Sequence, residues 1–199
     1  MTSNYIQTDR SNFSIAFLSG LLYLISFGVN AETVESTEYR YYEISPRSAY
    51  EIKPELMRRS PIRERGGSFN GHTDWLVNWS FSSTSGAYGC QLNSYQTTVH
   101  VIHTLPKLSS YVTDKRTIEV FNTFNEALTQ HEVNHGNNGL AAAREIDKAF
   151  SEIQPQQNCR NLERMINDIG NSIVQKYIYA DREYDRTTQN GFTEGAVIY

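Results

Sequence analysis

The sequence predicts an α+β fold in which a small antiparallel sheet packs against a long helical hairpin. Two patterns lead to this prediction. Over residues 73–81, the apolar side chains of Trp75, Val77 and Trp79 alternate with more polar ones, which is typical of a strand with one buried face. From residue 113 onward, apolar residues recur instead every three or four positions, which is typical of amphipathic helices.

The first half of the chain is expected to form the strands. Residues 39–44 are aromatic and β-branched enough for a first strand, and residues 48–59 are expected to form a short helix. A turn rich in glycine and serine joins the strand at residues 73–81 to a further strand at residues 91–105.

The second half is expected to form two helices. Asp114 is a candidate N-cap for the first, which is expected to bend at the Gly-Asn-Asn-Gly segment of residues 136–139. A turn-forming segment that begins at Pro155 ends this helix. The second helix has an apolar stripe and is expected to end at residues 181–183, before a polar tail at residues 184–191.

The first helix contains an HExxH motif, formed by His131, Glu132 and His135. Two histidines four positions apart lie on one face of a helix, about 5–6 Å apart, so both imidazoles can bind one zinc ion. With three protein ligands, zinc keeps a fourth position for a water molecule. Glu132 follows the first histidine directly, which lets its carboxylate reach that water and act as general base.

The two histidines of the motif continue the apolar stripe of their helix. Phe121, Phe124 and Leu128 precede them at alternating spacings of three and four, so both histidines are expected to point inward. The alternative to a metal site is a pair of buried structural histidines with a solvated Glu132 between them.

The other histidines are not expected to be ligands. His100 and His103 lie at an odd spacing on the predicted strand at residues 91–105, so they face opposite sides and cannot both serve one site. Each is interpreted as a surface or hydrogen-bonded histidine. His72 lies in the preceding loop and is assigned no role.

A third zinc ligand is expected from the end of the second helix. If the two helices fold back at Gln156, residues equally distant from that turn lie side by side, and the histidines face residues 177–181. Asp185 is favoured because it lies in the predicted tail and can turn back most freely. The alternative is that this tail is an ordinary solvated loop. The other candidate donors are Asp181, Glu183 and Glu145.

The first 31 residues are expected to be a secretory signal peptide. A short polar start leads into an apolar run over residues 13–29, which ends in the small-x-Ala pattern Val29-Asn30-Ala31. Cleavage after Ala31 would leave one domain over residues 32–199, secreted or periplasmic and without stable membrane insertion. The alternative is an uncleaved anchor, since the run is nearly long enough to span a bilayer.

The net charge argues against one class of partner, and the two cysteines predict a disulfide. The net charge is −4 and no basic cluster is evident, which argues against nucleic acid as a partner. In an oxidising compartment, the isolated pair Cys90 and Cys159 most simply forms one disulfide. Closing a loop of about 70 residues would stabilise the fold by roughly 4 kcal/mol, because it removes chain entropy from the unfolded state.

Several of these features occur together in one known family. The chain resembles the DUF922 family in its Tyr-Tyr-Glu-Ile first strand, its Thr73-Asp74-Trp75 strand, its Leu105-Pro106 step, its HEVNHG helix, its two cysteines and its tail from Tyr184 to Gly191. That family consists of small exported bacterial proteins regarded as zinc-dependent proteases. The resemblance covers nearly the whole mature chain.

The resemblance implies a zincin-like domain with His131 and His135 as zinc ligands and Glu132 as general base. The family's tail commonly has a histidine where this chain has Asn190. If that histidine is the usual third ligand, zinc in this chain rests on Asp185, on the weaker Asn190 carbonyl or on water.

Together these observations predict an exported zinc metallopeptidase that hydrolyses peptide bonds in a peptide or protein substrate. Glu132 would act as general base, and Tyr184 is a candidate hydrogen-bond donor to the oxyanion. The alternative is a catalytically inactive binding or assembly protein of the cell envelope that keeps the fold.

Overall fold

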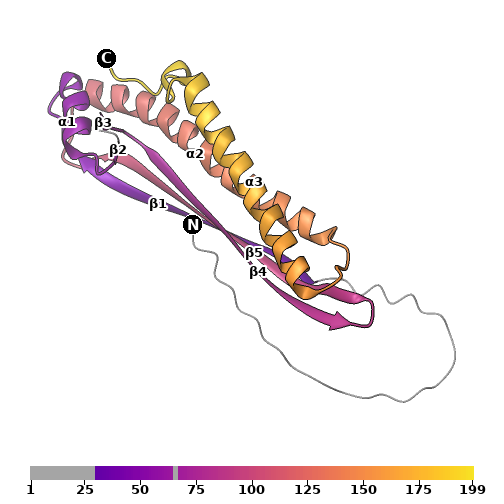
Figure 1. The fold of residues 1–199 in the computed structure, drawn as a ribbon. Coiled ribbons are helices and arrows are strands. Elements are labelled where there is room, and N and C mark those ends of the chain that lie inside the picture. The colour runs from indigo at the N-terminus through magenta and orange to yellow at the C-terminus, as the bar shows by residue number, and fades with distance from the viewer. Residues whose placement is uncertain (1–29, 65–66) are drawn as a thin grey trace, which may run out of the picture.

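The computed structural model describes residues 30–64 and 67–199 and has the predicted α+β fold (Figure 1). The predicted signal peptide lies outside the described residues except for its last two, Asn30 and Ala31, which begin the first strand. The elements in chain order are β1 (Asn30–Ile44), η1 (Ala49–Glu51), α1 (Ile52–Arg59), β2 (Arg63–Glu64), β3 (Gly67–Ser68), β4 (His72–Gly86), β5 (Gly89–Leu108), α2 (Lys115–Ser151), α3 (Cys159–Thr188) and η2 (Phe192–Glu194).

The main sheet has three strands in the order β1-β5-β4 and is mixed, so the prediction of an antiparallel sheet is wrong for one of its two pairings. β5 pairs with β4 in antiparallel register and with β1 in parallel register. The reason is the excursion through α1, which returns the chain to the end of the sheet where β1 finishes. β4 therefore runs opposite to β1, and the hairpin strand β5, which lies between them, runs with β1.

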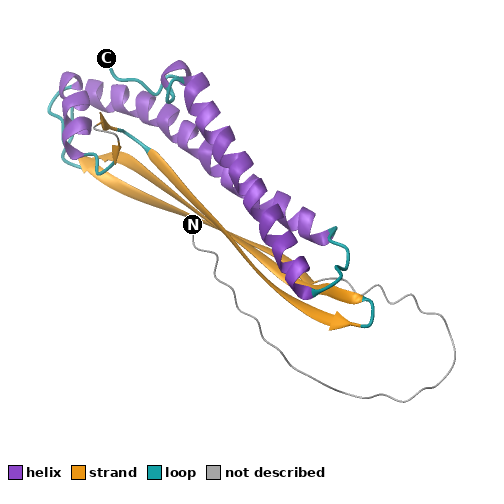
Figure 2. Ribbon diagram, in the orientation of Figure 1, coloured by secondary structure: helices purple, strands orange, loops and turns teal. Residues whose placement is uncertain are grey.

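The two long helices cover one face of this sheet (Figure 2). α2 is helical without interruption from Lys115 to Ser151, with Asp114 as its N-cap, so it continues through residues 136–139, where a bend was predicted. The glycines of that segment lie against the sheet. A Cβ atom at Gly136 would lie 2.7 Å from the His103 ring, and one at Gly139 would lie 2.6 Å from Trp75. These glycines therefore let the helix approach the sheet closely.

The second long helix, α3, extends further than predicted, to Thr188. Tyr184 and Asp185 consequently lie on its last turns and not in a tail. The expectation of an earlier end depended on where the apolar stripe stops. Beyond Ile178 the face of α3 that packs against α2 carries polar residues at helical spacing, Asp181 and Asp185. Their carboxylates contact His135 on α2.

Two clusters of buried side chains stabilise this arrangement, one on each side of the HExxH motif. The larger lies between the sheet and both long helices and includes Val99, Ile146, Phe150 and Leu162. The smaller lies at the α1 end of the sheet and includes Phe124. The motif therefore sits between two packed regions, which keep its helix at a fixed distance from the sheet.

The predicted disulfide between Cys90 and Cys159 is confirmed. It joins the start of β5 to the start of α3, and two backbone hydrogen bonds connect Cys90 with Gln156 beside it. The helical hairpin is thus covalently attached to the sheet at the end away from the motif (Figure 1). Within the described part of the chain, no helix combines the length and the apolar character needed to cross a membrane.

Candidate metal centre

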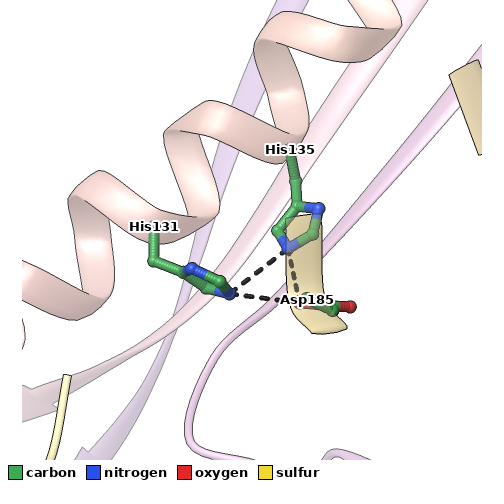
Figure 3. Close-up of side chains that lie close together, drawn as sticks. All are labelled: His131, His135 and Asp185. Atoms are coloured by element: carbon green, nitrogen blue, oxygen red, sulfur yellow. Dashed lines mark hydrogen bonds and ion pairs between the residues drawn. The ribbon is translucent and has the colours of Figure 1, made fainter. Parts of the chain in front are cut away.

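Three side chains on two helices converge at one point (Figure 3). The Nε2 atoms of His131 and His135 lie 3.3 Å apart, and Oδ1 of Asp185 lies 3.3 Å from the first and 3.0 Å from the second. Ligands at about 2.0–2.1 Å from a tetrahedral zinc ion are roughly 3.3 Å apart. The spacing of these three atoms therefore fits a tetrahedral zinc ion, and the group can hold a metal.

The outer nitrogen of each histidine contacts a carboxylate. Nδ1 of His131 lies 2.7 Å from Oε2 of Glu194, and Nδ1 of His135 lies 3.1 Å from Oδ1 of Asp181. When Nδ1–H donates to these oxygens, each Nε2 presents a lone pair to the shared point, beside the Asp185 oxygen. Three acceptors that face one another need a cation between them, and this arrangement is usual for histidine ligands of metals.

Asp181 accepts hydrogen bonds from three donors and does not face the point where His131, His135 and Asp185 converge. Its Oδ1 also accepts a hydrogen bond from Asn138 at 2.6 Å, and its Oδ2 accepts one from the indole of Trp75 at 2.6 Å. From the sequence, Asp181 is a candidate metal ligand. The structure instead makes it the partner that orients His135.

The charges around the shared point are strongly coupled. Burial lowers the pKa of His135, but the hydrogen bonds that it donates to Asp181 and Asp185 outweigh the effect of burial and raise this pKa to about 10. Burial raises the pKa of Asp185, but the two histidines outweigh it and hold this pKa well below its usual value. The pocket thus attracts positive charge, either as protons on the histidines or as a metal ion that displaces them.

Glu132 is buried, with 5% of its surface exposed, and its Oε2 accepts a hydrogen bond from the Thr73 hydroxyl at 2.7 Å. Burial raises the pKa of its carboxyl above the usual value, although the Thr73 hydrogen bond opposes the shift. Glu132 lines one open cleft of about 850 Å³ together with the three converging side chains. A carboxylate with a raised pKa beside side chains that can hold a metal ion is suited to general-base chemistry.

Tyr184 lies behind His131 and does not line that cleft. Its ring stacks on the His131 ring with centroids 4.9 Å apart. Its hydroxyl donates to Oε1 of Glu194 at 2.7 Å and accepts from Asn134 at 2.7 Å. Burial raises its pKa to about 12, and the nearby Glu194 adds to the shift. This position does not suit the predicted oxyanion donor, because the hydroxyl is directed to Glu194, and it favours a role in holding His131.

A comparison with protein families decides the family of the chain. The model described as "Bacterial protein of unknown function (DUF922)" matches residues 39–192. The chain belongs to the DUF922 family. The match includes the HExxH motif and Asp185 and ends two residues before Glu194. No curated protein and no solved structure matches this DUF922 chain significantly.

The structure also places the remaining candidates of this DUF922 chain. Glu145 lies ten residues beyond His135 on α2 and forms an ion pair with Lys176 on α3, and Glu183 forms one with Arg186. Asn190 lines the cleft, just beyond the end of α3, with a positive φ of 54°. The alternative of an ordinary solvated loop is wrong for residues 184–188, which are helical and include Asp185.

Sequence reasoning missed Glu194 as a site residue. Two glycines with positive φ, Gly191 at 81° and Gly195 at 94°, fold the chain after α3 into η2 and return it toward α2. A Cβ atom at Gly191 would be in tight contact with His131, 3.1 Å from its Cγ, and the positive φ would strain any other residue, so glycine suits this approach. The paired glycines around an acidic residue were the available signal.

Replacing Glu194 with alanine should weaken zinc binding about 10–100-fold, because His131 loses the carboxylate that fixes its ring and tautomer. Competition with a fluorescent zinc chelator measures this affinity. Glu183→Ala is the matched control, since Glu183 contacts Arg186 and not the histidines. Equal affinity in wild type and Glu194→Ala would show that Glu194 does not support the site.

Proposed function

We propose that this DUF922 protein is a zinc-dependent metallopeptidase that hydrolyses peptide bonds. The observation that supports this most is the spacing of 3.0–3.3 Å between the His131, His135 and Asp185 donor atoms, with the buried carboxylate of Glu132 in the same cleft. A structural zinc site is usually closed by four protein ligands, whereas three ligands leave a position for water and substrate. The three donors together with Glu132 therefore favour a catalytic site.

Each residue of the site has its own role in the proposed reaction. His131, His135 and Asp185 would hold the ion, and Glu194 and Asp181 would orient the two imidazoles. Bound zinc would polarise the scissile carbonyl and lower the pKa of a coordinated water to about 7. Glu132 takes a proton from the attacking water as the new C–O bond forms. It then passes this proton to the amine nitrogen as the C–N bond breaks.

The cleft is suited to an extended chain as substrate. One wall is the start of β4 with the loop before it, and the other is the last part of α3. Phe69, Trp75 and Ile178 supply apolar surface along these walls, and Arg182 supplies a positive charge. Binding sites usually combine apolar walls with a small number of polar or charged groups that orient the ligand. We therefore propose a peptide or protein substrate.

We also propose that the protein acts outside the cytoplasm, secreted or in the periplasm. The predicted signal peptide supports this location, and so does the disulfide between Cys90 and Cys159, because disulfides persist in oxidising compartments.

Glu132→Gln tests the proposed reaction. A peptide mixture from a digested bacterial proteome offers many different bonds at once, and mass spectrometry measures the rate at which any of them is cleaved. We expect Glu132→Gln to lower the rate about 10²–10⁴-fold while one zinc per chain is kept, because only the general base is lost. Glu126→Gln on the exposed side of α2 is the control and should match wild type.

Two results would count against the proposed peptidase. One is a wild-type protein that cleaves no peptide of the digest. The other is a Glu132→Gln variant that cleaves peptides as fast as wild type. Either result would favour the alternative, a binding or assembly protein of the cell envelope that keeps the fold.

A further inference from the structure

A buried hydroxyl and a buried imidazole lie behind the carboxylate of Glu132. Thr73 on β4 and His103 on β5 are register partners in the sheet. Oγ1 of Thr73 lies 2.7 Å from Oε2 of Glu132, 3.0 Å from the Glu132 backbone oxygen and 2.9 Å from Nδ1 of His103. His103 is only 3% exposed, so water does not compete for this contact.

The valence of the hydroxyl fixes the direction of these bonds. A threonine hydroxyl has one proton to donate and two lone pairs. Its shortest contact is to the charged Oε2 of Glu132, so the proton belongs there, since hydrogen bonds to ionised acceptors are the stronger ones. His103 then donates Nδ1–H to the hydroxyl. Thr73 then cannot donate to His103, so its proton is left to the two Glu132 oxygens, of which Oε2 is the nearer.

Two neighbours hold His103 in this orientation. Gly136 on α2 leaves the space that the imidazole occupies, since a Cβ atom there would lie 2.7 Å from Cε1 of His103. The ring of Tyr39 on β1 packs on the other side, with ring centroids 4.9 Å apart. All three strands and α2 therefore contribute to the position of one side chain.

The two oxygens of Glu132 are thus distinguished. Oε2 is held by Thr73, whereas the described residues provide no hydrogen bond to Oε1. A Cβ atom at Gly71 would lie 2.7 Å from Oε1, so the glycine leaves room for this oxygen at the wall of the cleft. Oε1 is consequently the oxygen that is free to accept a proton from water.

We infer that Thr73 and His103 are positioning residues for the general base: they hold Oε2 of Glu132 so that Oε1 faces the cleft. This inference rests on the proposed peptidase function. Neither residue exchanges a proton with the substrate. A rigidly held base keeps its oxygen within reach of the attacking water, and small misplacements of such groups reduce turnover strongly.

The test compares variants on the peptide that wild type cleaves best in the proteome digest. Thr73→Val keeps the shape of the side chain but removes the hydroxyl, and Thr73→Ser keeps the hydroxyl. We expect Thr73→Val to lower kcat about 10–100-fold with KM and zinc content unchanged, and Thr73→Ser to restore most of the rate. His103→Phe should lower kcat in the same way.

Thr97→Val is the matched control. Thr97 is fully buried on β5, on the same face of the sheet as His103, and its hydroxyl has no hydrogen-bond partner among the described residues. The same substitution there should leave kcat unchanged. If Thr73→Val does not fold, Thr73→Ala removes the same hydroxyl without the branched carbon and is read in the same way.

The outcomes separate the two claims. An active wild type with an equally active Thr73→Val variant would overturn the positioning role alone. A Thr73→Val variant that loses zinc, or a Thr73→Ser variant as slow as Thr73→Val, would also overturn it, since the effect would then be structural. A wild type that cleaves no faster than Glu132→Gln would overturn the proposed peptidase and the positioning role with it.

Discussion

Replacing His135 with alanine should lower the zinc affinity roughly a thousandfold. Structural zinc sites bind with about 10–16 kcal/mol, so each of three or four ligands accounts for several kcal/mol. The Nε2 atom of His135 faces both His131 and Asp185, and its Nδ1 atom contacts Asp181. The variant therefore loses a ligand and leaves two carboxylates without their partner. Competition titration with a zinc chelator measures the loss.

His100→Ala is the control for this prediction. His100 lies on β5 and contacts Ser36 and Glu38 on β1. Its spacing from His103 places it on the face of the sheet away from α2, so its removal should leave the zinc affinity unchanged. A His135→Ala variant that binds zinc as tightly as wild type would contradict the assignment of His135 as a ligand.

Removing the disulfide should lower the free energy of unfolding by about 4 kcal/mol, because it closes a loop of 69 residues and restricts the unfolded chain. Cys90 is fully buried in the larger cluster of side chains, so alanine is the better replacement for it than serine. Urea unfolding of the Cys90→Ala, Cys159→Ala double variant, followed by circular dichroism, measures the effect.

Zinc content provides the control for this second prediction. The disulfide lies at the start of α3, whereas Asp185 lies near its end, so the folded double variant should still bind one zinc per chain. Wild type treated with a reductant should unfold at the same urea concentration as the double variant. Equal unfolding midpoints for oxidised wild type and the double variant would contradict the stabilising role of the bond.

The sequence predicted the elements of the fold better than their pairing. Period-two alternation over residues 73–81 indicates a strand with one buried face, and β4 has its aromatic side chains toward the helices. The same alternation is compatible with a parallel or an antiparallel neighbour. The parallel pairing of β1 with β5 depends on the path through α1, which no local pattern in β1 encodes.

The position of Asp185 shows why counting residues outward from the turn at Gln156 located the third ligand only approximately. A turn centred on Gln156 placed residues 177–181 opposite the histidines, whereas His135 contacts Asp181 and Asp185. The linker after α2 carries the chain beyond the end of that helix, where Gln156 pairs with Cys90 (Figure 1). α3 therefore starts further along the sheet and needs more residues to reach the site.

The partners of the motif were harder to predict than the motif itself. HExxH spacing identifies His131, Glu132 and His135 because their chemistry depends on one helical turn. Glu194 and Thr73 reach the same site from a turn and from a strand, and their separation in sequence carries no periodic signal. Such residues are found only once the fold brings them together.

X-ray absorption at the zinc edge of the zinc-loaded protein tests the central claim, a metal centre formed by His131, His135 and Asp185, most directly. The spectrum should fit two imidazole nitrogens and two oxygens at about 2.0–2.2 Å, the oxygens being those of Asp185 and water. In Asp185→Ala, both imidazole nitrogens should remain while zinc binds more weakly. A spectrum fitted by oxygen ligands alone, as for hydrated zinc, would contradict the metal centre.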